Sequence, residues 1–188
     1  MILRPSPFDK RSEGSGLVGS FGDRVVAEAR AWVGTPAHWQ QSVKGVGCDC
    51  KGLIAGVARE LGRPEADSLF ARKADYREGR IDTQLLRGGL AALFDRVSGA
   101  QRGDIMLLLI GGLPQHLAFV VDADLAGQPS AMIQCTVGGR LGVRERRVLP
   151  QDRIDSVWRW RELENHLDAL DATGPSTRSA QTGASDVD

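Results

Sequence analysis

Cys50 is the side chain in this sequence that is best placed for covalent chemistry. It follows a glycine-rich stretch, residues 45–49, and stands where an apolar helix is expected to begin. Asp49 is a good N-cap residue, and the positive end of a helix stabilises a thiolate and lowers the pKa of a cysteine placed there. The position therefore predicts a nucleophilic thiolate. A free cysteine is also a common space-filling residue in protein cores, and the residues alone leave that alternative open.

His116 is the best candidate for the base that such a thiol needs. A nucleophilic thiol requires a base within hydrogen-bond reach and a third group that orients the base. Of the three histidines, His166 is expected to be exposed near the tail and His38 lies in a loop. His116 is predicted to open a strand, where a side chain is held rigidly near solvent. The next strand supplies Gln134, whose amide oxygen is expected to accept a hydrogen bond from the ring. An ordinary strand-edge histidine is the alternative.

The elements that must position these side chains are helices in the first half and strands in the second. Leu53, Val57 and Leu61 recur at a spacing of four and predict a helix from Asp49 to Gly62. Further helices are predicted over 23–33 and 83–93, with irregular chain over 65–82. Short apolar runs separated by turn residues predict strands over 105–110, 117–121, 131–135, 143–148 and 157–160. This order predicts an α+β fold, with the cysteine helix on one face of an antiparallel sheet.

Composition indicates one domain and excludes some classes of partner. The 188 residues contain 24 basic and 24 acidic side chains, so no net field draws the protein toward nucleic acid or an anionic membrane. Residues 1–21 read as a flexible arm, 22–164 as the folded domain and 165–188 as a disordered tail. No signal peptide or membrane span is predicted. The cysteine count of three is odd, so a disulfide framework is not expected.

Several stretches resemble the NlpC-type papain-like cell-wall cysteine peptidases, and most closely the compact subgroup found in tailed phages and gene transfer agents. The similar stretches are residues 34–36 (GTP), 44–50 with 52–53 (KGVGCDC, GL), 103–105 (GDI) and 116–118 (HLA). The resemblance runs from about Asp23 to about Glu162. It implies a papain-like fold with Cys50 as the nucleophile, His116 as the general base and Gln134 as the third polar residue.

The resemblance also implies a function. It implies a cysteine endopeptidase that cuts peptide bonds in bacterial peptidoglycan stem peptides by a Cys-His-Gln thiolate mechanism, with neither a metal nor an organic cofactor. Its partners would be the stem peptide and phage-type tail or baseplate proteins. Such an enzyme would be synthesised in the bacterial cytoplasm without a signal peptide. It would act on the cell wall as part of a phage-like particle.

Three positions depart from the family pattern. Ala37 stands where many members have a tyrosine that faces the substrate, so the contact must come from neighbouring residues. Lys51 replaces a small residue and is expected to point into solvent. Gln134 replaces a common histidine, and an amide orients an imidazole without adding negative charge. The candidate substrate-binding residues are His38, Trp39, Asp49 and Lys51.

Other functions remain open from the residues. A non-catalytic wall-binding or tail-structural module would keep the fold with a degenerate site. Acyl transfer to an amine would use the same thiol chemistry as hydrolysis. A zinc site of three sulfurs and one nitrogen is a weaker alternative, because a Cys-x-Cys pair lacks the usual spacing. Its ligands would be Cys48, Cys50, Cys135 and His116.

Overall fold

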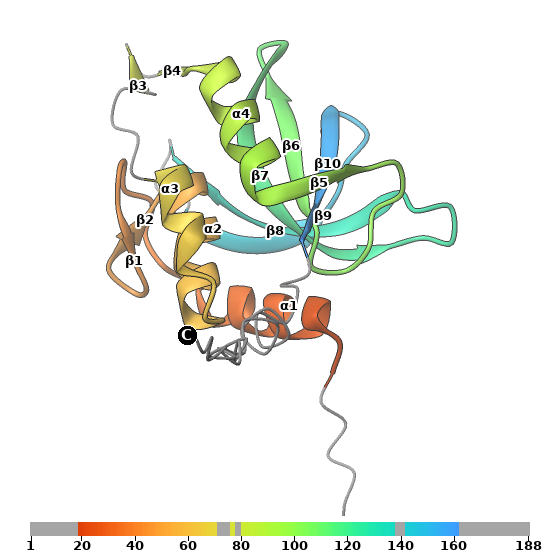
Figure 1. The fold of residues 1–188 in the computed structure, drawn as a ribbon, viewed down its shortest axis with the longest axis horizontal. Helices are drawn as coiled ribbons and strands as arrows, with labels where there is room; N and C mark the ends of the chain where they lie inside the picture. The colour runs from red at the N-terminus through yellow and green to blue at the C-terminus, as the bar shows by residue number, and fades with distance from the viewer. Residues whose placement is uncertain (1–18, 71–75, 78–79, 138–141, 162–188) are drawn as a thin grey trace, which may run out of the picture.

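The predicted α+β class is confirmed: helices from the N-terminal half pack on a six-stranded antiparallel sheet (Figure 1). The computed structural model describes residues 19–70, 76–77, 80–137 and 142–161. The first helix begins at Phe21, one residue before the predicted start of the folded domain at residue 22. Most of the predicted N-terminal arm and all of the predicted C-terminal tail lie outside the described residues, and so does His166.

Each long helix begins at a side-chain cap. Ser20 and Asp23 form a capping box at the first helix, and Asp49 and Asp82 cap the next two long helices. These caps satisfy backbone N–H groups that have no partner within the helix. The predicted helices are confirmed, and the predicted irregular region also contains short helical turns and a short strand pair. The bounds are α1 Phe21–Ala31, α2 Cys50–Glu60, η1 Pro64–Ala66, α3 Asp67–Phe70 and α4 Thr83–Leu93.

The main sheet has the strand order β5-β10-β6-β7-β8-β9, with every pair antiparallel. Its strands are β5 Phe94–Val97, β6 Ile105–Ile110, β7 Leu113–Ala123, β8 Pro129–Thr136, β9 Gly142–Arg147 and β10 Ile154–Trp160. Two small hairpins accompany it, β1 Ser42–Val43 with β2 Gly47–Cys48 and β3 Tyr76–Arg77 with β4 Arg80–Ile81. The predicted strands are confirmed, whereas β5 and both hairpins were not predicted. His116 lies inside β7 and does not open it, because pairing with β6 extends the strand back to Leu113.

The two faces of the sheet bury different groups of side chains. One face packs against the helices and includes Leu117, Phe119 and Ile133 in a core shared with Cys50. The other face carries Ala118 and several further side chains in a second cluster that contains no residue of the helices. Members of that cluster include Met106, Leu108, Val120, Met132 and Val157. Because consecutive strand residues face opposite sides, these two sets assign a side to residues 116–121 of β7 and 131–135 of β8.

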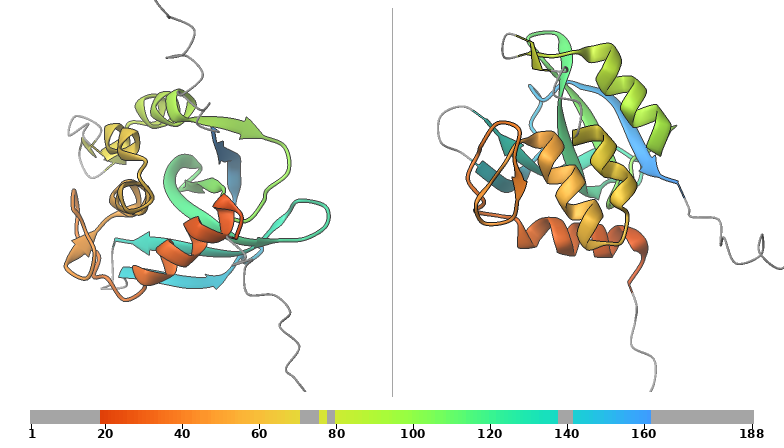
Figure 2. Two further views of the ribbon diagram at one scale, coloured as in Figure 1. Left: turned by 60° about the horizontal axis from the view of Figure 1, so that its bottom comes forward. Right: turned by 60° about the vertical axis from the view of Figure 1, so that its left-hand side comes forward.

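The helices surround one side of a strongly curved sheet (Figure 2). α1 and α2 approach closely because Gly56 on α2 leaves room for the Trp32 ring, which is 1% exposed. Trp158 and Trp160 alternate on β10, and both lie in the helix-facing core. The described helices include none long and apolar enough to span a membrane.

Candidate active site

Cys50 is the first residue of α2, and Asp49 holds this end of the helix. One carboxylate oxygen of Asp49 accepts a hydrogen bond from Gly52 N–H at 2.7 Å. The other accepts one from Gln40 N–H at 2.9 Å. The cap therefore fixes the start of the helix to the preceding loop. The predicted N-cap is confirmed, and Cys50 is 5% exposed.

The stretch 34–36 positions this loop against the sheet. Gly34 N–H donates to Val143 O at 3.0 Å, and Val143 N–H donates back to Thr35 O at 2.9 Å. Cys48 N–H in turn donates to Pro36 O at 3.1 Å. Backbone hydrogen bonds thus connect the loop before the cysteine to β9. A substitution in residues 34–36 that disrupts them would displace the start of α2.

The predicted lowering of the Cys50 pKa is wrong for this structure. Burial raises the pKa of the thiol to about 12, and the Asp49 carboxylate acts in the same direction. A backbone hydrogen bond from Leu117 and the charge of Lys51 lower it by less. A helix N-terminus stabilises a nearby anion by about 0.3–2 kcal/mol, whereas burying an unpaired charge costs considerably more. In the structure as described Cys50 is therefore a neutral thiol.

The predicted contact between His116 and Gln134 is present. His116 Nε2 lies 2.7 Å from the end of the Gln134 side chain. Ala118 is the residue directly opposite Gln134, so His116 and Gln134 are diagonal neighbours on one face of the sheet. Burial lowers the pKa of His116, and the Arg146 guanidinium acts in the same direction. The ring is therefore neutral near pH 7.

Arg146 decides how the Gln134 amide is turned. With its oxygen toward His116, the amide would present its NH₂ group to the guanidinium, donor against donor. In the opposite orientation the amide nitrogen donates to His116 Nε2 at 2.7 Å, and the oxygen accepts from Arg146 Nε at 2.7 Å and Nη2 at 3.1 Å. The second orientation satisfies all three groups. The expectation that Gln134 accepts from the ring is thus reversed, because a cation occupies the oxygen side of the amide.

Asp152 anchors Arg146. Its carboxylate accepts from Arg146 Nη1 at 2.6 Å and from Nη2 at 2.8 Å, and it also accepts from Leu149 N–H at 2.7 Å. The arginine keeps the pKa of Asp152 below its ordinary value. Asp152, Arg146, Gln134 and His116 form one hydrogen-bonded chain, which we call the His116 network. Sequence reasoning missed Arg146 and Asp152, because only the tertiary register places them beside Gln134.

Cys50 lies against Leu117 of β7, and His116 is the preceding residue of the same strand. The Cys50 and His116 side chains therefore lie on different sides of the sheet. The backbone hydrogen bond of Leu117 reaches Cys50, and Leu117 shares the helix-facing core with it. His116 alternates with Leu117 and lies opposite Leu108, which belongs to the second cluster. Within the described residues, no hydrogen bond joins the Cys50 thiol to the imidazole. The structure brings the predicted nucleophile and base to the same strand without pairing them.

The His116 imidazole lines a cavity that lies at the end of β6, near the start of β7 and at the end of β8. Its lining includes His116, Gln134 and Arg146 from the His116 network, together with Trp39 and Ile110. Trp39 is 48% exposed and Ile110 is 57% exposed, so apolar side chains lie at the surface beside a neutral imidazole. Trp39, which the sequence predicts to bind substrate, lies in this lining. His38 is also exposed, and its Nδ1 lies 3.1 Å from Trp39 O.

Asp49 and Lys51 are placed less favourably for binding a substrate. Both side chains are 0% exposed. The expectation that Lys51 points into solvent is wrong, since the second residue of α2 faces the interior between the helix and its neighbours. Asp49 directs its carboxylate to the backbone of its own loop and helix. Any contact of these two side chains with a substrate would require this end of the domain to open.

The other cysteines pack beneath the candidate site. Cys48 and Cys135 are buried and free, and the Cys135 thiol donates to Cys48 O at 3.0 Å. This contact and burial raise the pKa of Cys135. Among the residues that the structure describes, no group of three or more histidine, cysteine, aspartate and glutamate side chains is arranged to hold a metal ion. Cys48 is a small side chain buried behind the loop and is 0% exposed.

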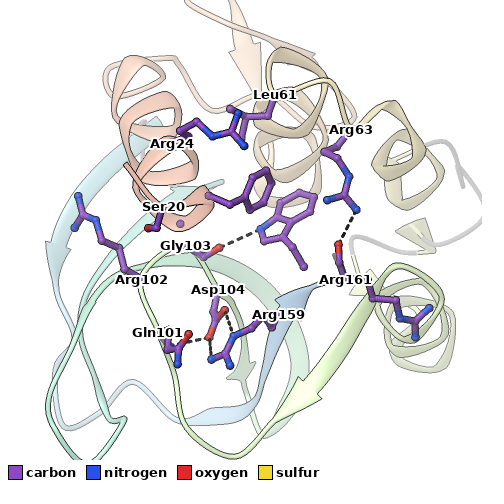
Figure 3. A pocket seen from close by; sticks show the side chains of 13 residues that line it. Ser20, Arg24, Leu61, Arg63, Gln101, Arg102, Gly103, Asp104, Arg159 and Arg161 are labelled. Atoms are coloured by element: carbon purple, nitrogen blue, oxygen red, sulfur yellow. Dashed lines mark hydrogen bonds and ion pairs between the residues drawn. The ribbon is translucent and has the colours of Figure 1, made fainter. Parts of the chain in front are cut away.

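A second cavity lies toward the other end of α2 and is rich in arginine (Figure 3). Its arginines are engaged within the protein: Arg159 binds both oxygens of Asp104, and Arg63 donates to Arg161 O at 3.2 Å. Arg63 also pairs with Glu65, and Arg102 with Asp23. These pairs make the cavity a structural junction between α1, the loop after α2 and β10.

No family model matches this chain, and a search of curated proteins finds no match.

Proposed function

We propose that this protein is a cysteine peptidase of the NlpC type that cleaves bacterial peptidoglycan stem peptides. The observation that carries the proposal is the approach of the first residue of α2, Cys50, to β7 at Leu117, next to a histidine held by Gln134. Thiol acyl transfer needs a thiol and an imidazole that can come within hydrogen-bond reach, and Cys50 lies against the residue that follows His116 in β7. The papain-like fold is part of this proposal.

The reaction would begin with transfer of the thiol proton. The Cys50 sulfur attacks the carbonyl carbon of the peptide bond while His116 accepts the proton, and a tetrahedral oxyanion forms. Backbone N–H groups at the start of α2 would stabilise that oxyanion. His116 then gives the proton to the departing amine nitrogen as the C–N bond breaks, which leaves a thioester. Water attacks the thioester, and the released carboxylic acid and the regenerated thiol complete the cycle.

The starting state is a neutral thiol and a neutral imidazole. Burial raises the Cys50 pKa and lowers the His116 pKa, so a preformed thiolate and imidazolium pair is disfavoured. Proton transfer must therefore accompany substrate binding. Because His116 and Cys50 lie on different sides of β7, turning the side chain alone does not bring the ring to the sulfur. The backbone of β7 at the register shift beside His116 has to rearrange as well when substrate binds.

The cavity at Trp39 is the proposed entry for the peptide. Trp39 and Ile110 provide apolar contact, and the imidazole lies in the same lining. Action on the wall from a phage-type tail or baseplate completes the proposal, and this part rests on the resemblance of the sequence motifs alone.

The test is digestion of purified peptidoglycan, with released fragments identified by mass spectrometry. Wild-type protein is expected to release stem-peptide fragments, and Cys50→Ala is expected to release none. Cys135→Ser is the matched control, because it alters another buried thiol and retains a donor for Cys48 O. Equal release by wild type and Cys50→Ala would contradict the nucleophile assignment.

A non-catalytic wall-binding module is the second candidate. It is favoured by the neutral, buried Cys50 and by the missing hydrogen bond between Cys50 and His116 in the described structure. Such a module would sediment with peptidoglycan equally well as wild type and as Cys50→Ala, and neither form would release fragments from walls of several chemical types.

A further inference from the structure

We propose that Arg146 is a positioning residue that turns the Gln134 amide and thereby holds His116 in the tautomer protonated on Nδ1. The inference deepens the proposed function and rests on it for its meaning in catalysis. The contacts that carry it are the hydrogen bonds of the His116 network.

Arg146 sets the orientation of the Gln134 amide. Gln134 oxygen accepts from two nitrogens of Arg146, at 2.7 and 3.1 Å. Turning the amide over would replace these contacts with an NH₂ group facing a guanidinium, so both would be lost and a repulsion added. A hydrogen bond to a charged group is stronger than one between neutral groups, so the two contacts with Arg146 select one orientation of the amide.

Asp152 holds the Arg146 guanidinium in a fixed position. Arg146 is bound through two nitrogens by Asp152, whose carboxylate is itself held by Leu149 N–H. The side chain of Asp152 is only 14% exposed. The orientation of Gln134 is therefore set by an ion pair on the β9 side of the sheet and by the loop before β10.

The orientation of the Gln134 amide determines the tautomer of His116. Gln134 in this orientation donates its N–H to Nε2, and a ring nitrogen that accepts a hydrogen bond carries no proton. The neutral ring must then carry its proton on Nδ1. In an imidazolium both ring nitrogens carry a proton, so the Nε2–H would face the amide N–H, donor against donor. Arg146 therefore disfavours the charged ring by its own charge and through the amide that it turns.

The consequence for the proposed reaction is a restrained base. Nε2 is occupied by Gln134 and Nδ1 already holds a proton, so His116 has no free lone pair for the Cys50 proton. The base becomes competent when the Gln134 amide turns over, which moves the ring proton to Nε2 and frees Nδ1. That turn requires Gln134 to leave Arg146. The network thus keeps the resting site from reacting until a ligand competes for Arg146 or displaces the amide.

The test is the tautomer itself, read from ring ¹⁵N chemical shifts of the full-length ¹⁵N-labelled chain across a pH series. Loss of one set of signals in His116→Gln assigns the ring. Wild-type His116 is expected to be neutral, protonated on Nδ1, and to titrate below the ordinary histidine pKa of about 6.5. A wild-type ring protonated on Nε2 would overturn the inference.

Two variants test the role of Arg146. Arg146→Met is expected to shift His116 toward the Nε2 tautomer and to raise its titration midpoint by about one pH unit, the usual size of such effects. Arg144→Met is the matched control, because Arg144 lies opposite Gln134 in the ladder, is exposed and makes no hydrogen bond to it in the described structure. Equal spectra of the two variants would overturn the inference.

Gln134→Glu decides the matter if Arg146→Met does not fold. The carboxylate keeps the shape and the contacts to Arg146, and it can only accept from the ring. We expect the Nε2 tautomer and a raised midpoint, and an unchanged Nδ1 tautomer would contradict the inference.

Peptidoglycan digestion separates this inference from the proposed function. A several-fold faster release by Arg146→Met than by wild type supports both. Absence of release from every form, together with the expected tautomers, contradicts the peptidase and leaves the positioning role of Arg146 intact. Release by wild type with the Nε2 tautomer contradicts the positioning role alone.

Discussion

Asp49 accepts a hydrogen bond from the backbone N–H of Gly52 at 2.7 Å, and this contact fixes the first turn of α2. The carboxylate is fully buried, and its second oxygen holds the loop before the cysteine through Gln40. A single side chain therefore sets both the start of the helix and the path of the chain into it.

Replacing Asp49 with alanine is expected to lower the free energy of unfolding by about 2 kcal/mol, the upper end for loss of an N-cap, because two backbone donors lose their acceptor. Urea unfolding monitored by circular dichroism measures the loss. Asp82→Ala, which removes the exposed cap of α4, is the control and is expected to cost about half as much. A larger loss at Asp82 would contradict the special role of Asp49.

The high Cys50 pKa predicts a slow reaction with alkylating agents. With a pKa of about 12, almost no thiolate exists at pH 8, whereas an ordinary thiol is substantially ionised there. We expect Cys50 in the folded protein to react with iodoacetamide at least about 100-fold more slowly than a free thiol. Mass spectrometry of timed samples measures the rate, with urea-unfolded protein as the reference. Rapid labelling at pH 7 would instead indicate an active-site thiolate.

The same pKa predicts how stability changes with pH. A raised folded-state pKa means that the folded protein holds this proton more tightly than the unfolded chain. The resulting stabilisation is complete below the unfolded pKa and is lost as pH rises toward about 12. Relative to Cys50→Ala, the wild-type free energy of unfolding should fall between about pH 9 and 12, by at most about 1.4 kcal/mol per pH unit. Parallel curves for the two proteins would contradict the assigned pKa.

Gly56 is expected to be intolerant of even a methyl group. A Cβ there would lie 2.1 Å from Cη2 of Trp32, in the contact between α1 and α2. Gly56→Ala should lower the unfolding free energy by about 1–3 kcal/mol, as overpacking does. Gly88→Ala is the matched control, because a Cβ at this exposed position of α4 meets nothing within 4 Å. That control should raise stability by about 0.5–1 kcal/mol. Thermal unfolding of both variants measures the contrast, and equal effects would contradict the packing argument.

Asp104 holds the junction in Figure 3. Its buried carboxylate accepts from Arg159 Nε at 3.0 Å and Nη2 at 2.8 Å and from Gln101 N–H at 2.8 Å. Asp104→Ala would remove a buried acceptor of three hydrogen bonds, while Arg159, whose side chain is 34% exposed, keeps its contact with Gly99 O, so the change should cost about 1–3 kcal/mol of unfolding free energy. Chemical denaturation measures it, with Asp95→Ala as the control, since the Arg161–Asp95 pair is exposed and contributes about 0–1 kcal/mol. Equal losses of unfolding free energy in Asp104→Ala and Asp95→Ala would contradict the role of Asp104 in holding the junction.

Local sequence signals were sufficient for most of the elements. Asp49, the four-residue spacing of Leu53, Val57 and Leu61, and Gly62 predicted a helix that the structure places at Cys50–Glu60. The predicted ranges 83–93 and 105–110 match α4 and β6 in both bounds. These patterns are short-range, because caps, turns and apolar periodicity act within a few residues. The β5 strand was missed because its pattern is weak and its pairing partner, β10, lies far along the chain.

The chemistry of the site depended on tertiary structure. The sequence by itself determined the residue types that converge on β7, including the contact of His116 with Gln134. Only the fold decided the burial that keeps Cys50 protonated and the interior position of Lys51. Only the register of β9 against β8 decided that Arg146 reaches the Gln134 amide. Helix caps and apolar spacing are local properties of the chain. Desolvation and the direction of a hydrogen bond depend on neighbours that only folding brings together.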